Sequence, residues 1–183
     1  MNTLSEEDAK LFYQLWLPLL EYVNKKTRAV PSLKHIDTAK RLNTTDVKKV
    51  ADRLWEDVSL IDRYLQANPE IPEEHREILL GWKRRIRGRF TMERHLKDGS
   101  IFIGPESEET VYLVSGIITS WEEMFDWRPM PVFMNAVLIP FRDVIISDGL
   151  NVSYSIMIGP NMKKELKDIY MSAKKEKRII RSI

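Results

Sequence analysis

Two residues of catalytic type, Glu93 and His95, stand two positions apart in a stretch where apolar and polar residues alternate. Residues i and i+2 of a β-strand point to the same face of a sheet, so this spacing places a carboxylate beside an imidazole. Such a pair can act as general base and acid in a hydrolase-type enzyme. The same spacing is expected of two polar residues on the solvent face of a sheet, and we favour this second interpretation.

Basic residues form a second candidate site, for nucleic acid. One cluster places five cations in seven residues between Trp82 and Phe90, and another lies near the C-terminus. If the clusters converge in the fold, they can bind phosphate groups while the aromatic rings stack on bases. If they do not converge, they are solvated ends of helices, which is the interpretation we favour. The first cluster is Lys83, Arg84, Arg85, Arg87 and Arg89, and the second is Lys174, Lys175, Lys177, Arg178 and Arg181.

Aromatic residues near the middle of the chain are a candidate interaction surface. Trp121, Phe125 and Trp127 surround a short acidic segment that precedes Pro129 and Pro131. If these rings are exposed, they offer a surface to a partner protein or to a second copy of the chain. If they are buried, they close one end of a sheet. The sequence leaves both alternatives open.

Several kinds of chemistry lack the residues that they need. The chain has no cysteine, which excludes disulfides, thiolate metal sites and a cysteine nucleophile. His75, on a predicted helix, has no ligand partner at helical spacing, and His35 and His95 lie in a predicted loop and a predicted strand. The glycines form neither a dinucleotide-binding motif nor a P-loop. We therefore expect no cofactor and no metal, and we lean away from an enzyme.

Charge and hydropathy narrow the partners further. A net charge of +2 is too small for a general attraction to nucleic acid or membrane. The N-terminus lacks the basic and apolar regions of a signal peptide. The most apolar segment, Met130 to Phe141, is shorter than the ~20 residues of a membrane span. We expect no membrane binding and a cytoplasmic protein.

Helical periodicity dominates the first half of the chain. Apolar residues recur every three or four positions from Thr44 or Thr45 to Leu65, which predicts one long helix. A helix from Ser5 carries Pro18 inside its pattern, so we expect either a kink or two shorter helices. A third helix is expected from Pro72 to Gly88. Residues 37–42 are expected to form a short helical turn, and residues 32–55 allow a helix-turn-helix, although the acidic residues of its second helix disfavour DNA binding.

The spacing of apolar residues changes from 3.6 to 2 at Gly88, where we expect strands to begin. Two Asp-Gly pairs, Asp98-Gly99 and Asp148-Gly149, predict hairpin turns, because both turn positions require φ > 0. Residues 150–158 alternate strictly and predict a strand with one buried face. The other expected elements are strands at 90–96, 100–103, 110–116, 132–139 and 144–147, a short helix at 120–125, a helix from Pro160 to Ala173 and a short edge strand at 178–183.

This order of elements predicts an α+β fold. An N-terminal helical region, residues 1–87, precedes a β-rich region, residues 88–183, and we expect the two to pack as one unit. The second region is expected to hold a mainly antiparallel sheet of about six strands and a C-terminal helix. Its short connections allow the sheet to be open or to curl toward a small barrel, and the sequence does not decide between them.

A run of motifs carries a family resemblance over roughly residues 45–183. They are Trp82-Lys83, Gly88 with Phe90, Arg94-His95-Leu96-Lys97, Ile101-Phe102-Ile103, Val111-Tyr112-Leu113-Val114, Leu138-Ile139-Pro140-Phe141 and Ile145-Ile146-Ser147-Asp148-Gly149-Leu150, with Leu54-Trp55, Asn68-Pro69, Tyr170, Ala173-Lys174 and Ile179-Ile180. On these motifs the chain resembles an uncharacterised bacterial family of unknown function. Some similar proteins carry a cysteine-rich, zinc-binding tail. This sequence has no cysteine, so the resemblance implies no zinc site.

The sequence alone does not identify an activity. Our first hypothesis is a non-enzymatic binding or interaction protein that forms a homo-oligomer or binds a partner protein. Nucleic-acid binding through the two basic clusters is the second hypothesis, and a hydrolase-type enzyme around Glu93 and His95 is the third.

Overall fold

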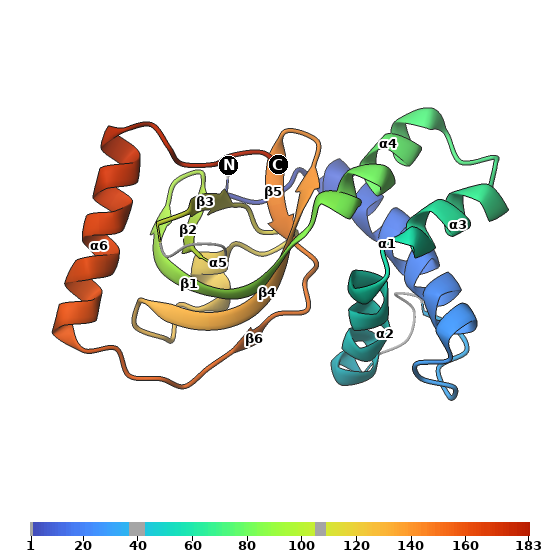
Figure 1. Ribbon diagram of the computed structural model, residues 1–183, viewed down its shortest axis with the longest axis horizontal. Helices are drawn as coiled ribbons and strands as arrows, with labels where there is room; N and C mark the ends of the chain where they lie inside the picture. The colour runs from blue at the N-terminus through green and yellow to red at the C-terminus, as the bar shows by residue number, and fades with distance from the viewer. Residues whose placement is uncertain (1, 37–42, 105–108) are drawn as a thin grey trace. The chain divides into compact units, whose positions relative to one another are not determined.

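The computed structural model describes residues 2–36, 43–104 and 109–183 (Figure 1). The chain divides into two compact units. The helical unit is Glu7–Lys83, and the C-terminal unit joins Met1–Glu6 to Arg84–Ile183. The predicted turn at residues 37–42, and with it part of the helix-turn-helix, lies outside the described residues. That residues 1–87 and 88–183 pack together stays a prediction.

Four α-helices and one 3₁₀ turn make up the helical unit. They are α1 (Glu6–Thr27), α2 (Thr44–Glu56), α3 (Ser59–Ala67), α4 (Glu73–Gly81) and η1 (Trp82–Arg84). Helix α1 continues through Pro18, which lies on its exposed side. Three tryptophans meet in the core of this unit: Trp16 stacks on Trp55 with ring centroids 5.5 Å apart, and Trp82 meets Trp16 edge-on.

The prediction of a single helix from residue 44 to 65 is wrong, because Asp57 and Val58 separate two helices, α2 and α3. The Asp57 carboxylate accepts hydrogen bonds from the Ser59 backbone N–H and from the Ser59 hydroxyl, at 3.1 and 2.5 Å. A carboxylate two residues ahead of a serine satisfies backbone donors that a new helix start leaves free. The apolar spacing continues across the break, and for this reason periodicity alone misses it.

The C-terminal unit is built on a mainly antiparallel sheet of six strands. The strands are β1 (Ile86–Leu96), β2 (Gly99–Ile103), β3 (Val111–Val114), β4 (Val132–Phe141), β5 (Val144–Ser147) and β6 (Val152–Ser153). They follow the order β1-β2-β3-β5-β4-β6, and β1 also pairs with β4. The pairings therefore return to the first strand, and Figure 1 shows β1 and β4 as long, curved neighbours. The α+β fold class is confirmed.

The two Asp-Gly pairs behave differently. Asp98-Gly99 reverses the chain between β1 and β2, as predicted. Asp148-Gly149 does not reverse the chain. Strands β5 and β6 pair one after the other with the same edge of β4, and both run antiparallel to β4, so they share one direction. The Asp148 N–H bonds to the Val137 carbonyl at 3.1 Å and its carboxylate accepts from the Leu150 N–H at 3.0 Å, so the pair interrupts one edge without turning it.

Three other strand boundaries also differ from the prediction. Strand β1 begins at Ile86, so Gly88 lies inside a strand and does not end a helix. The predicted strand at 150–158 is reduced to Val152–Ser153, since the described pairing of β6 with β4 consists of Asn135–Val152 and Met134–Ser153. The edge strand expected at 178–183 is a single bridge from Ile180 to Tyr112.

Each face of the sheet buries its own apolar cluster. The inner cluster, which includes Phe90, Met92 and Met134, lies within the curve of the sheet and also contains Trp121 from α5 (Trp121–Met124). The outer cluster joins Ile101 and Ile103 to helix α6 (Pro160–Lys175). Among the residues described, no helix is long and apolar enough to cross a bilayer.

The Asp98-Gly99 turn supplies a stability prediction. A Cβ at Gly99, where φ is +150°, would lie 2.8 Å from the Val114 carbonyl oxygen. Gly99→Ala is therefore expected to lower the free energy of unfolding by roughly 1–3 kcal/mol. Gly159→Ala is the matched control, because no atom lies within 4 Å of the added methyl, and it should cost under about 0.5 kcal/mol. Urea unfolding measures both, and equal effects would contradict the prediction.

Candidate ligand-binding site

A groove of about 580 Å³ opens between α6 and the outer surface of β1 and β4. Its walls are largely apolar, and all the residues that line it belong to the C-terminal unit. They are Arg89, Phe90, Thr91, Ile103, Gly104, Phe133, Met134, Tyr154, Ile156, Met162, Glu165, Leu166 and Ile169. We call this the outer groove.

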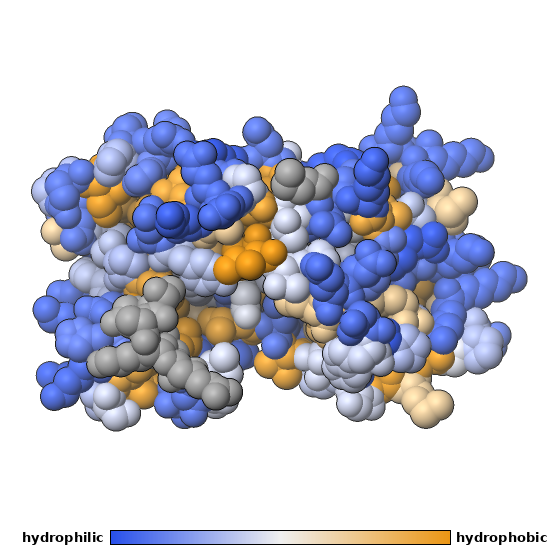
Figure 2. Space-filling view, turned by 180° about the vertical axis from the view of Figure 1, so that it is seen from behind, coloured by the Kyte–Doolittle hydropathy of each residue, from blue (hydrophilic) through white to orange (hydrophobic). Residues whose placement is uncertain are grey.

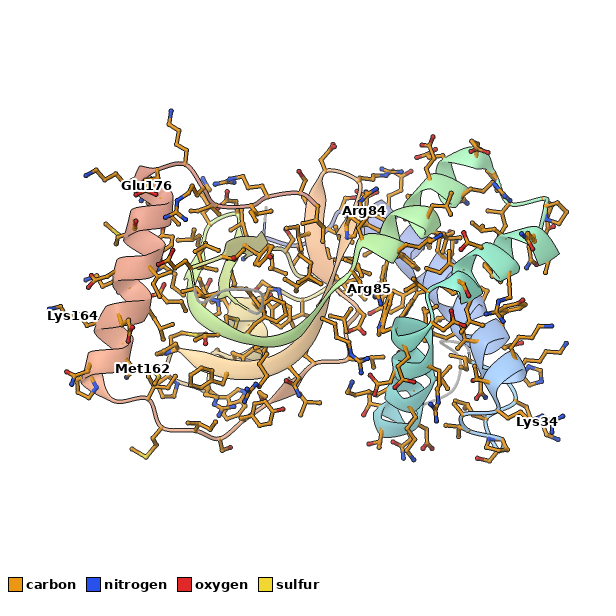
Figure 3. All side chains as sticks on the ribbon, viewed as in Figure 1. Lys34, Arg84, Arg85, Met162, Lys164 and Glu176 are labelled. Atoms are coloured by element: carbon orange, nitrogen blue, oxygen red, sulfur yellow. The ribbon has the colours of Figure 1, made fainter. Side chains whose placement is uncertain are left out.

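The outer groove exists because α6 contacts the sheet along only part of its length. Its buried residues are Leu166, Tyr170 and Ala173, which join the outer cluster. Residues 160–165, the first turns of α6, are all exposed. Met162, labelled in Figure 3, lies in these first turns and is 46% exposed. The space beneath the first turns is the groove.

Strand register fixes which residues form the sheet wall. Arg89 pairs with Asn135, and Thr91 pairs with Phe133, across the β1–β4 ladder. Paired residues of an antiparallel ladder point to the same face. Phe90 and Met134 form the pair between them and belong to the inner cluster, so the two outer pairs face α6.

Tyr154 holds the remaining wall in place. Its N–H bonds to the Phe133 carbonyl at 2.8 Å, and its carbonyl accepts a hydrogen bond from the Arg128 guanidinium. The Asn135 amide donates to its hydroxyl. These contacts attach the chain after β6 to the edge of β4, where Tyr154 lines the groove.

Two charged side chains stand on opposite walls of the outer groove. Arg89 on β1 and Glu165 on α6 are both exposed. Within the described ranges, neither makes an ion pair or a side-chain hydrogen bond. A guanidinium that no described residue pairs, above apolar walls, can bind a carboxylate or a similar oxyanion by donating two parallel hydrogen bonds.

A β-bulge separates the predicted catalytic pair. Met92 pairs with Phe102 and Arg94 with Ile101, so Glu93 is the extra residue of β1. Its carboxylate binds Arg94 through two hydrogen bonds, at 2.5 and 2.9 Å, and these raise the pKa of Arg94 above its ordinary value. The Arg94 guanidinium also lies 4.2 Å from the ring centroid of Tyr170 on α6. The pair thus fastens α6 to the sheet beyond the groove.

His95 has different partners. Its Nδ1 forms a hydrogen bond of 2.7 Å with the hydroxyl of Ser100, a buried residue of β2. Burial lowers the pKa of His95, and the negative charge of Glu122 offsets part of this effect. Glu93 therefore bonds to Arg94, whereas His95 bonds to Ser100. The hypothesis of a hydrolase-type enzyme stays a prediction without added support.

The basic clusters do not come together. Lys83 binds both carboxylate oxygens of Asp62, and Arg181 binds Asp98 at 2.8 Å. Figure 3 shows Arg84 and Arg85, which precede β1, at one side of the C-terminal unit, and Glu176, just beyond α6 beside the second cluster, at the other. Of the ten basic residues, Arg89 alone lines the outer groove.

The aromatic candidates also separate. Trp121 is buried, and its indole N–H donates to the Ser115 carbonyl at 3.2 Å. Phe125 stacks on Trp121 and is half-buried. Trp127 is 71% exposed and is the one ring of the three that a partner can reach.

A larger groove, of about 880 Å³, lies on the helical unit along α1 and next to Tyr64 of α3. Ile36 lines it at the border of the described residues, as Gly104 does in the outer groove. In the part of the chain that the structure describes, no three His, Asp or Glu side chains gather where they could hold a metal ion. The outer groove is the stronger candidate because Arg89, a residue of the first basic cluster, lines it.

Comparisons with known proteins supply no relative: no family model, no curated protein and no solved structure matches this chain. The resemblance based on sequence motifs stays a prediction. The argument for the outer groove rests on its geometry.

The sequence analysis assigned Arg89 to a site but missed the rest of the outer groove. Phe133 belongs to β4, and Tyr154 follows β6, which pairs with the edge of β4. The two residues are neighbours through this pairing and lie far apart in the sequence. One signal was present in the sequence: Met162 continues the apolar stripe of α6 toward the polar first turns, where Glu165 also lies.

The environment of His95 predicts a pH-dependent stability. Its pKa is lowered by folding, so the unfolded chain binds the proton more tightly. The stabilisation is complete above the unfolded pKa of ~6.5 and is lost as the pH falls below it. The free energy of unfolding should thus fall less between pH 7 and pH 5 in His95→Gln than in the wild type. Urea unfolding at both pH values measures this, and His35→Gln, at an exposed position, is the control.

Proposed function

We propose that this protein is a non-enzymatic binding protein whose outer groove takes a small, elongated, mainly apolar molecule with an acidic group. The observation that carries the proposal is the Arg89 guanidinium, which no described residue pairs, at an apolar groove of about 580 Å³. This volume lies within the ~300–1,000 Å³ typical of small-molecule sites.

The walls favour an apolar body for the ligand. Ile103, Phe133 and Ile169 present hydrocarbon from β2, β4 and α6. Burial of apolar surface contributes about 25 cal/mol per Å², so a narrow hydrocarbon or aromatic body gains affinity here without specific contacts.

The charges favour one orientation of the ligand. An acidic group near Arg89 gains a charge-assisted hydrogen bond, whereas the same group near Glu165 is repelled. A molecule with one acidic end therefore fits better than a diacid. The Tyr154 hydroxyl adds a hydrogen-bond donor on the third wall.

Binding is better supported than catalysis at this site. The titratable groups on the walls are Arg89, Glu165 and Tyr154, which come from three different elements. General acid–base chemistry needs a group within about 2.6–3.2 Å of the proton that it moves, oriented by a neighbour. We also propose a cytoplasmic location, supported by the lack of cysteine.

A pair of fluorescent probes tests the role of charge. Anilinonaphthalene sulfonate is an apolar anion, and N-phenylnaphthylamine has the same ring skeleton without the sulfonate. Arg89→Gln should weaken sulfonate binding by about 3–10-fold and leave the neutral probe unchanged. Glu165→Gln should strengthen sulfonate binding by up to about 3-fold. Fluorescence titration of the wild type and of both variants with each probe gives the dissociation constants.

Blocking the groove tests the site itself. Ile169→Trp places a larger ring in the outer groove and should weaken both probes. Met171→Trp, at an exposed position on α6 outside the groove, should change neither. Unchanged binding in both Ile169→Trp and Arg89→Gln would show that the probes bind elsewhere. Unfolding midpoints near that of the wild type confirm that each variant is folded.

A further inference from the structure

The last strand of the sheet has a free edge. Strand β6 pairs with β4 on one side and ends the strand order, so its other side has no neighbour in the described chain. In Figure 1, β6 and the chain after it run along the lower margin of the C-terminal unit toward α6. We call residues 152–158 the open-edge segment.

Much of the backbone of this segment has no hydrogen-bond partner among the described residues. The Tyr154 N–H bonds to Phe133, but residues 155–158 make no backbone hydrogen bond with any described residue. Because successive residues of a strand point their N–H and C=O groups to opposite edges, Ser155 and Met157 present theirs to the side away from β4. Such an edge is a template for another strand.

The segment is also apolar and uncharged. Val152, Ile156 and Met157 are 42%, 56% and 98% exposed. Figure 2 shows hydrophobic side chains reaching the lower margin of the C-terminal unit among hydrophilic ones. Residues 149–162 contain no charged side chain, and the open-edge segment contains no proline. Natural sheets usually protect a free edge with lysine, proline, a bulge or a covering helix.

We propose that two copies of this chain pair antiparallel through their open-edge segments, which joins their sheets across a two-fold axis. The alternating sequence that predicts a strand at 150–158 then forms that strand in the dimer. This inference goes beyond ligand binding and does not depend on it.

Self-pairing is favoured over a different partner because the segment is complementary to itself. In an antiparallel pair about a two-fold axis on residue i, position i+k lies opposite i−k, so even-numbered residues of one copy face even-numbered residues of the other. Val152, Tyr154, Ile156 and Ile158 therefore form one continuous apolar strip. No charged residue within 149–162 meets its own copy, and like charges placed opposite each other would oppose pairing.

Sedimentation analysis from about 1 to 200 µM protein tests the proposal. The wild type is expected to shift from monomer to dimer with concentration. Met157→Lys should weaken the dimer by at least about 10-fold, because a charge on an edge blocks pairing. Met171→Lys is the matched control at an exposed position on α6 and should dimerise as the wild type does. Neither substitution removes a buried side chain.

A second variant tests the backbone pairing directly. Ser155→Pro removes an N–H that bonds to no described residue and is expected to abolish the dimer. The Tyr154 N–H faces β4, and successive N–H groups of a strand point to opposite edges, so hydrogen exchange should show that the amides of Ser155 and Met157 become protected as concentration rises. A strict monomer at 200 µM, a dimer unaffected by both variants, or amides that stay unprotected would each overturn the proposal. Probe binding by Arg89→Gln is read separately, so failure of one proposal leaves the other intact.

Discussion

The β1–β4 ladder is the interaction on which the C-terminal unit depends. Seven residue pairs, from Ile86–Leu138 to Met92–Val132, join β1 to β4. Strands β2, β3 and β5 stand between these two in the strand order of the sheet. Without this ladder the sheet would not return to its first strand. The same ladder directs Phe90 and Met134 into the inner cluster and Arg89 and Phe133 toward α6. It therefore positions both the core and the groove wall.

A local irregularity in β1 complements the regular ladder. The extra residue Glu93 bends the strand and binds Arg94, and Arg94 packs on the ring of Tyr170. Bulges commonly redirect side chains at functional sites. Here the bulge fastens the second half of α6, and the first half remains away from the sheet. One end of the helix is fixed to the core while the other forms the roof of the outer groove.

Sequence reasoning predicted those features that depend on local patterns. The α+β order and the Asp98-Gly99 hairpin follow from spacing and turn chemistry. The predictions fail where contacts between segments distant in the sequence determine the structure. Asp148-Gly149 has the residues of a hairpin turn, but the edge of β4 accommodates β5 and β6 in the same direction. The outer groove was missed for the same reason, because its walls come from elements far apart in the chain.

The attachment of α6 at one end has a consequence for how this protein can diverge. Residues of the inner cluster that do not line the outer groove, such as Met92 and Phe102, differ from those that shape its roof, such as Met162 and Glu165. Mutations in the roof change the lining of the groove while the inner cluster stays intact. Descendants of this chain can thus vary the roof at little cost in stability, since Met162 and Glu165 are exposed.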